Sequence, residues 1–126
     1  MKQLSNVSKE KVFYVFEGPV IRSVYELAEA LSVMNPKSFS HHVSGSKNDF
    51  ANWVRDVLDD SILGMRISAQ KERKEMEKII RQRIKDLERE HMPAHASIKL
   101  FKSGTVDFII GLVLGVIAGL ILASFI

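Results

Sequence analysis

Hydrophobic positions in the first 60 residues recur with the spacing of short amphipathic helices. The face of the first helix consists of Val24, Leu27, Ala28 and Leu31. Ser23 followed by Glu26 forms a capping box that predicts its start, and the pattern runs to about Met34. Asn35 can cap a second short helix, because Pro36 at its first position has no N–H to lose.

The next apolar stripe is the clearest pattern in the chain. It consists of Phe50, Trp53, Val54, Val57 and Leu58. Either Asn48 alone or Ser46 with Asp49 can cap this helix. Asp59 or Asp60 then begins another helix. The pattern therefore predicts several short helices in close succession, as in a small helical bundle.

From Ser61 to about Glu90 the sequence predicts a single long helix, with no glycine after Gly64 and no proline. A narrow apolar row repeats along it at helical period: Ile62, Met65, Ala69, Met76, Ile80, Ile84 and Leu87. The start of this helix can cover the preceding helices, but so thin a row cannot bury its whole length. The remainder, residues 66–91, is predicted to project as a charged stalk or to pair with a second copy.

A coiled coil of two stalks would place the seam residues Met76, Ile80, Ile84 and Leu87 between the copies. The same register brings Arg66, Arg73 and Arg83 to the seam, where arginine is costly unless it is paired. We therefore expect at most a weak homodimer.

Residues 12–16 are β-branched or aromatic and predict one short N-terminal strand, ended by a turn at Glu17, Gly18 and Pro19. A lone strand has no ladder partner within the chain. It would pair across a dimer or lie extended on the helices. Residues 1–10, before the strand, are predicted to be flexible.

Residues 108–126 form an uncharged, almost entirely apolar run that reaches the last residue of the sequence. A bilayer core of about 30 Å needs roughly 20 apolar residues in a helix, so the run predicts a transmembrane helix over residues 107–126, with Asp107 near its start. A buried core helix is the alternative, but such helices seldom lack both charge and a polar face. We expect a single-pass, tail-anchored membrane protein.

Four small residues lie on one face of this run. They are Gly111, Gly115, Gly119 and Ala123, spaced four apart. In lipid, small residues at this spacing let helix backbones approach closely and favour association. The face predicts helix packing in the membrane, either with a second copy or with another protein.

Pro93 ends the long helix and begins a hinge and membrane-interface segment, residues 92–106. Lys99 and Lys102 stand among apolar residues there, which suits contact with lipid head groups. The predicted fold is therefore mainly α: a helical head (residues 11–65), the stalk, the hinge and one transmembrane helix.

Charge is distributed unevenly along the chain. Residues 1–60 carry seven Lys and Arg against eight Asp and Glu, whereas residues 61–106 carry eleven against six. Because the aromatic residues lie mostly in the acidic part, a nucleic-acid partner is not favoured. The basic part lies next to the apolar run, where it can meet the lipid bilayer.

Positive residues precede the run, and the N-terminus has no apolar signal sequence. We therefore expect a cell-membrane location with the N-terminal part in the cytoplasm. The lack of cysteine agrees with a reducing compartment.

The motif SFSHHV, followed by NDFANWVRDVLDD, resembles a small prokaryotic, largely archaeal domain family marked by SFxxH and NDFxxWxxDV. The matching residues include Ser38, Phe39, His42, Asn48, Asp49, Phe50 and Trp53, and the likeness extends over about residues 11–65. In the family an aromatic or basic pair usually precedes the histidine, whereas Ser40 and His41 stand there in this chain. The resemblance implies a module without implying a reaction or a cofactor.

His42 with Asp49 and Asp56, or with Asp60, could in principle form a metal site or an acid and base pair. The structural alternative has Ser38 and Asp49 capping helices while His42 packs beneath Trp53. We favour the structural alternative, because the sequence holds no phosphate loop, recognised metal spacing or nucleophile with its base. No catalytic, cofactor or metal residue is predicted, and His91 and His95 are separated by Pro93.

Three functions remain. The first is a non-enzymatic membrane-anchored adaptor or scaffold that binds an unidentified protein partner through its head. The second is a membrane-tethered sensor of a ligand or metal. The third, least favoured, is a membrane-tethered nucleic-acid-binding regulator.

Overall fold

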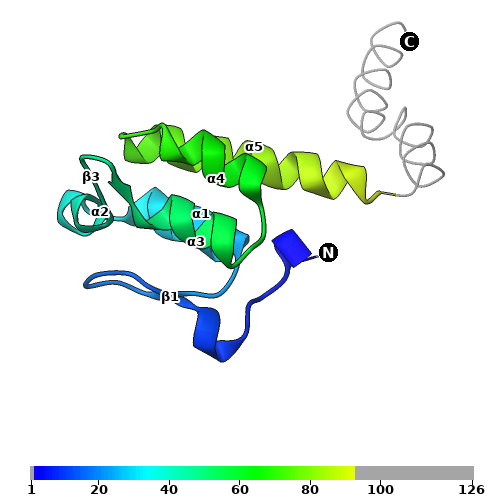
Figure 1. Ribbon diagram of the computed structural model, residues 1–126, viewed down its shortest axis with the longest axis horizontal. Coiled ribbons are helices and arrows are strands. Elements are labelled where there is room, and N and C mark those ends of the chain that lie inside the picture. Colours follow the sequence, from blue (N-terminus) through cyan, green and yellow to red (C-terminus); the bar gives the residue numbers. More distant parts are fainter. Residues whose placement is uncertain (1, 93–126) are drawn as a thin grey trace, which may run out of the picture. The chain divides into compact units, whose positions relative to one another are not determined.

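The structure, a computed structural model, describes residues 2–92 (Figure 1). This part of the chain is mainly helical and also contains two short antiparallel strand pairs. The prediction of a mainly α fold is therefore confirmed. Residues 2–88 belong to one compact unit, which we call the folded unit.

The elements follow one another along the chain in the order η1 (Lys2–Leu4), η2 (Lys9–Lys11), β1 (Phe13–Tyr14), β2 (Val20–Ile21), α1 (Val24–Val33), α2 (Pro36–His42), β3 (Val43–Ser44), β4 (Lys47–Asn48), α3 (Asp49–Asp56), α4 (Ser61–Ser68) and α5 (Arg73–Glu90). The first two are single 3-10 turns.

Polar side chains begin the first two α-helices where the sequence predicted them. Ser23 caps α1 by accepting a hydrogen bond from the amide of Glu26 at 3.2 Å. The Glu26 carboxylate in turn accepts from the amide of Arg22 at 2.7 Å. Asn35 caps α2 by accepting from the amide of Ser38 at 2.8 Å, with a proline at the first helical position.

Asn48 and Asp60 begin the next two helices, for which the sequence left alternatives. Asn48 caps α3 by accepting from the amide of Ala51 at 3.0 Å. Asp60, rather than Asp59, caps α4 by accepting from the amide of Leu63 at 3.1 Å. The starts of α1 to α4 are thus each fixed by one side chain immediately before the helix.

The N-terminal strand has a partner within the chain, so the prediction of a lone strand is wrong. The register pairs Phe13 with Ile21 and Tyr14 with Val20. A tight turn returns the chain, with Glu17 at φ 54° and the amide of Gly18 bonded to the carbonyl of Val15 at 3.0 Å. Glycine fits this turn because a Cβ on Gly18 would lie 2.7 Å from Cγ1 of Val15.

A second hairpin, for which the sequence predicted no strand, follows α2. β3 pairs with β4, and Gly45 between them has φ 56°, a conformation that suits glycine. Strands of two residues show no period-2 pattern, so nothing in the sequence distinguished this hairpin from a loop.

The single long helix predicted from Ser61 to Glu90 is also wrong, because residues 69–72 separate α4 from α5. The chain bends there, with the amide of Gln70 bonded to the carbonyl of Ile67 at 3.0 Å. A straight helix of this length would reach roughly 45 Å and would carry its second half away from the folded unit. The bend lets both helices bury apolar side chains in one core.

The stalk seam predicted along α5 is buried in that core. Met76, Ile80, Ile84 and Leu87 are each at most 8 % exposed. The first three share one hydrophobic cluster with Leu27 of α1 and Phe50 of α3. These residues are therefore not available as a coiled-coil seam, and α5 is not a projecting stalk over this length.

In α4 the predicted apolar face has the wrong phase. Ile62 and Met65 are 45 % and 66 % exposed, whereas Leu63 and Ile67 are fully buried. Both pairs fit a helical repeat, and the contact with α3 decides between them. The close contact runs past Gly64, where a Cβ would lie 3.0 Å from Cβ of Arg55.

The first residues of the chain, predicted to be flexible, lie on the folded unit. Leu4 and Val7 pack against the core cluster. The amide of Val7 donates to the carbonyl of Arg22 at 2.8 Å, which places this segment beside the start of α1.

Residues 93–126 lie outside the described part of the chain. The predictions for most of the hinge, for Lys99 and Lys102, for the face of Gly111, Gly115, Gly119 and Ala123, and for the transmembrane helix all fall there. Within residues 2–92, none of the helices combines the length and the apolar character that crossing a membrane requires.

Candidate functional site

The motif residues singled out in the sequence come together at one end of the folded unit. Ser38, Phe39 and His42 belong to α2, Asn48 ends β4, and Asp49, Phe50 and Trp53 belong to α3. All of them are buried except Asp49, which is partly exposed. The hairpin of β3 and β4 between the two helices sets their side chains against each other.

Both nitrogens of the His42 imidazole have hydrogen-bond partners. Nε2 accepts from the backbone amide of Phe16 at 2.9 Å. An acceptor nitrogen carries no proton, so the proton is on Nδ1, which lies 2.9 Å from Oδ2 of Asp49. The ring thereby joins the turn after β1 to the start of α3. A metal or a proton-transfer partner could reach it only by replacing one of these bonds.

Aromatic rings enclose the same histidine. Phe13 meets it edge-on at a centroid distance of 4.9 Å, and Phe50 lies 5.2 Å away. Trp53 packs edge-on against Phe13 at 5.9 Å, and its Nε1 donates to the carbonyl of Lys11 at 2.7 Å. The cluster ties the N-terminal segment, α2 and α3 into one core.

The acidic residues near the motif do not converge on His42 as a metal site would require. Asp49 lies 3.6 Å from Nζ of Lys47 as well as bonding the histidine. Asp56 is paired with its neighbour Arg55, and Asp60 is paired with Arg83 of α5. Among residues 2–92, no group of three or more potential ligands could hold a metal ion.

The structural alternative was therefore right that His42 is buried and hydrogen-bonded, but the rings of Phe13 and Phe50 pack against it and not that of Trp53. It was wrong about the caps. Asn35 and Asn48 cap the helices, and not Ser38 and Asp49. Asn48 also donates from Nδ2 to the carbonyl of Ile67 at 2.9 Å, which holds the end of β4 against α4. Asparagine immediately before a helix is typical of a cap, so the sequence could predict the first role of Asn48. No local pattern predicted its hydrogen bond to the carbonyl of Ile67, 19 residues away.

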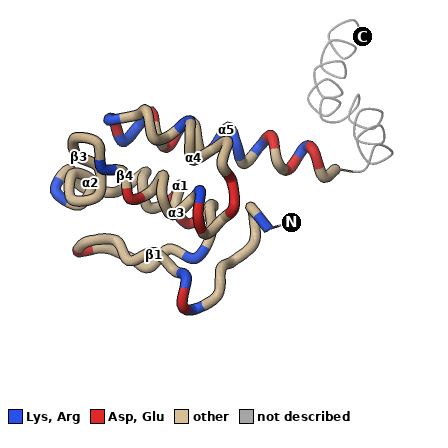
Figure 2. Tube along the Cα trace, viewed as in Figure 1, with Lys and Arg blue, Asp and Glu red and all other residues tan. Residues whose placement is uncertain are grey.

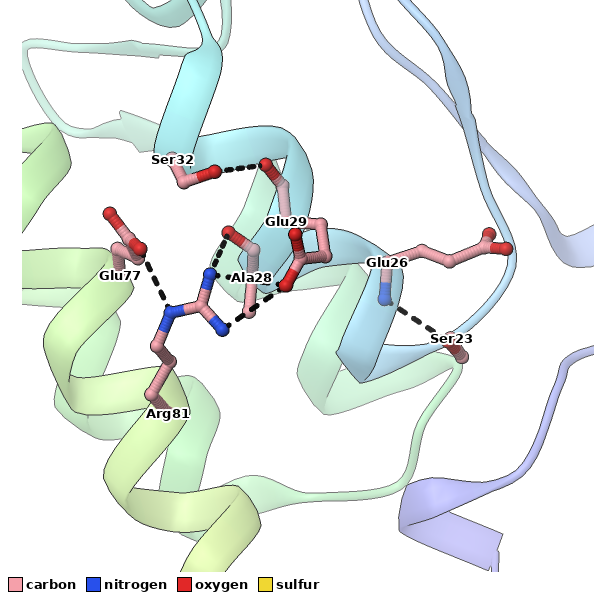
Figure 3. A network of polar contacts seen from close by, with 7 residues as sticks. All are labelled: Ser23, Glu26, Ala28, Glu29, Ser32, Glu77 and Arg81. Carbon is pink, nitrogen blue, oxygen red and sulfur yellow. Dashed lines mark hydrogen bonds and ion pairs between the residues drawn. The ribbon is translucent and has the colours of Figure 1, made fainter.

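Arg81 is a residue that the sequence did not single out, and it links α5 to α1 (Figure 3). Its Nε donates to Glu77 at 2.8 Å on the same helix. Its other nitrogens lie 3.3 Å from Oε1 of Glu29 and 3.5 Å from the carbonyl of Ala28. The hydrogen bond that Arg81 donates to Glu77, followed by the interactions with Glu29, raises the pKa of Arg81 and keeps it cationic.

A second link between the same helices lies further along α5. The phenol of Tyr25 donates to Oε1 of Glu88 at 2.8 Å. This hydrogen bond is the main reason that the pKa of Tyr25 lies above its ordinary value. Together with Arg81, it holds the polar edges of α1 and α5 side by side.

An apolar hollow of about 410 Å³ opens between β2 and the second half of α1. Pro19, Val20, Ala30 and Val33 are among the residues that line it. Val33 is 83 % exposed and lies one turn after the buried Ala30. An apolar residue so exposed next to other apolar groups is typical of a contact surface.

Comparison of this chain with protein families, with curated proteins and with solved structures found no match. The resemblance of residues 11–65 to the family with the SFxxH and NDFxxWxxDV motif stays a prediction.

Proposed function

We propose that this chain is a non-enzymatic, single-pass membrane protein that presents its folded unit to a protein partner on the cytoplasmic side, as an adaptor or scaffold. The observation that carries the proposal is the uncharged run at residues 108–126. The folded unit has a hydrophobic core of its own, so it does not depend on the run for burial.

The roles of the motif residues favour this function over sensing of a metal or small ligand. His42 and Asp49 bind each other, and Asp60 is engaged elsewhere in the fold. A sensor would need some of these groups to face a ligand. The hollow beside Val33 instead offers exposed apolar side chains to a protein partner.

The anchor is tested by fractionating cells that express the full chain. We expect it to sediment with membranes and to resist extraction with carbonate. Replacing Ile117 and Leu120 with lysine should release it, because each lysine near the middle of a span opposes insertion by about 3 kcal/mol. Replacing the same two residues with valine is the matched control and should change nothing.

The partner surface is tested separately by cross-linking in native membranes and identifying the attached protein. Val33→Glu should remove the cross-link, whereas Ser40→Glu, on an exposed face of α2, should keep it. A full chain found in the soluble fraction would overturn the anchor. A cross-link that both variants keep would place the partner elsewhere.

Self-association in the membrane is part of the same proposal. The face of Gly111, Gly115, Gly119 and Ala123 would carry it, since the apolar row of α5 is buried. Gly115→Leu with Gly119→Leu should weaken any cross-link between copies while leaving the chain in the membrane.

A further inference from the structure

One side of α5 carries a row of basic residues opposite its buried row. Lys74, Lys78, Arg81 and Lys85 recur at intervals of four, three and four residues, which places them on one side of the helix. The buried residues Met76, Ile80 and Ile84 occupy the other side. Figure 2 shows lysine and arginine recurring along α5.

Most acidic residues of α5 lie beside this row, although Glu88 continues it three residues after Lys85. Glu77 is bonded to Arg81, Glu88 accepts from Tyr25, and Asp86 accepts from Gln82 at 3.0 Å. A shallow hollow of about 500 Å³ follows the row, and five cationic side chains line it against one acidic side chain: Arg73, Lys74, Lys78, Arg81 and Lys85 against Glu77. The hollow is therefore lined mainly by positive side chains, although Arg81 is paired with Glu77 and Glu29.

We propose that this row binds the anionic phospholipid head groups of the membrane in which the chain is anchored. The proposal rests on the anchor at residues 108–126. The 17 residues 91–107 separate α5 from that run. They can span about 55 Å when extended, so the helix can reach the bilayer surface. The row has no apolar side chain to insert, so the contact is electrostatic and at the level of the head groups.

Tethering makes such a contact effective even though each charge contributes little. A lysine close to an anionic surface contributes a factor of about five to binding. Three lysines therefore favour the docked position by roughly a hundredfold, and the anchor keeps the surface within reach of the folded unit. Salt should weaken the contact, because these side chains are exposed.

The test uses the full chain in vesicles of phosphatidylcholine alone or of phosphatidylcholine mixed with phosphatidylserine. The chain has no cysteine, so Gln82→Cys gives one labelling site beside the row, and Ser40→Cys gives a control site on α2. Energy transfer from the label to a dilute lipid-head-group acceptor reports the approach. We expect the label at position 82 to approach only the anionic vesicles, and raised salt to reverse the approach.

Two charge-matched variants decide whether the row is responsible. Lys74→Gln, Lys78→Gln and Lys85→Gln together should shift the docked equilibrium by about a hundredfold and abolish the signal. Lys9→Gln, Lys37→Gln and Lys47→Gln remove the same charge elsewhere on the folded unit and should keep it. Equal signals in the two lipids, or equal loss in the two variants, would overturn the proposal.

Flotation of the vesicles separates this proposal from the anchor. If the chain floats with both lipids but gives no composition-dependent signal, the anchor is supported and lipid binding by the basic row is overturned. A chain that floats only with anionic vesicles, and only with the three lysines, keeps the row and loses the anchor. A chain that floats with neither loses both. A shift by duplex DNA that needs the same lysines, without any response to lipid, would overturn lipid binding in favour of nucleic acid.

Discussion

Asp60 and Arg83 form a two-point ion pair that fastens α5 to the start of α4. Nε of Arg83 lies 3.0 Å from Oδ2 of Asp60, and its NH2 group lies 3.1 Å from Oδ1. The side chains are only 2 % exposed for Asp60 and 12 % for Arg83. This pairing explains how an arginine is tolerated on the side of α5 that faces the core.

Asp60→Asn should lower the free energy of unfolding by about 3 kcal/mol, because it leaves a largely buried guanidinium without its counter-charge. Asparagine can still cap α4, so the loss would report the ion pair and not the cap. Asp59→Asn is the matched control, since Asp59 is exposed and asparagine tolerates its positive φ. Urea unfolding measures both, and equal losses would assign no special role to the pair.

Trp53→Ala should cost roughly 3 to 5 kcal/mol, the range for emptying a large aromatic site in a core. Trp53→Phe keeps most of the volume and removes the bond to the carbonyl of Lys11, so it should cost about 1 kcal/mol. Thermal unfolding of both variants separates packing from hydrogen bonding. A melting curve unchanged by the alanine variant would contradict the buried position.

His42→Phe should destabilise the folded unit by about 1 to 3 kcal/mol, because the amide of Phe16 loses its acceptor. His41→Phe should have almost no effect, since His41 is exposed and stacks on Phe16 with ring centroids 4.2 Å apart. Zinc should not raise the melting temperature of the unchanged chain. A zinc-dependent increase that His42→Phe abolishes would instead favour the sensor.

Ile80→Lys should unfold the folded unit, because it buries an unpaired charge in a fully buried position. Gln82→Lys adds the same charge to an exposed position of α5 and should leave stability almost unchanged. Unfolding curves and size measurements are compared for the two. If Ile80→Lys changed only the association of copies, a stalk seam would be the better description of this row.

Tyr25 should titrate at a higher pH in the folded chain than after loss of its acceptor. The hydrogen bond to Glu88 raises the pKa of Tyr25. The stabilisation from this hydrogen bond is therefore fully present below the pKa of an unfolded tyrosine, and it is lost as the pH rises through the pKa of the folded state. Tyr14→Phe leaves Tyr25 as the only tyrosine. In that background, phenolate absorbance should appear at lower pH after Glu88→Ala, and an unchanged titration would contradict the bond.

Local signals explain what could be predicted from the sequence. The caps Ser23, Asn35 and Asn48 act on amides three residues away, so their effect can be read within one turn of helix. The stripe of α3 was equally clear, because Phe50 and Trp53 lie on one face of a short amphipathic helix.

The rest depends on contacts between distant segments. Residues 69–72 contain no strong helix breaker, and the chain bends there because the core needs the apolar rows of both α4 and α5. The phase of α4 was ambiguous for the same reason. At the motif, the sequence indicated a structural His42, but its partner Phe16 stands 26 residues earlier and left no local pattern.

The close approach at Gly64 links the positions of three helices. A side chain there would press on Arg55 and on the carbonyl oxygen of Ala51, only 3.3 Å from the added carbon, and would lift α4 from α3. The amide of Gly64 donates to the backbone carbonyl of Asp60, so a displaced α4 would move Asp60 as well. This movement would draw the Asp60 carboxylate away from Arg83. Alanine at position 64 has a better helix propensity than glycine, which would stabilise α4. The same substitution would weaken the contact between Asp60 and Arg83 that holds α5 in place.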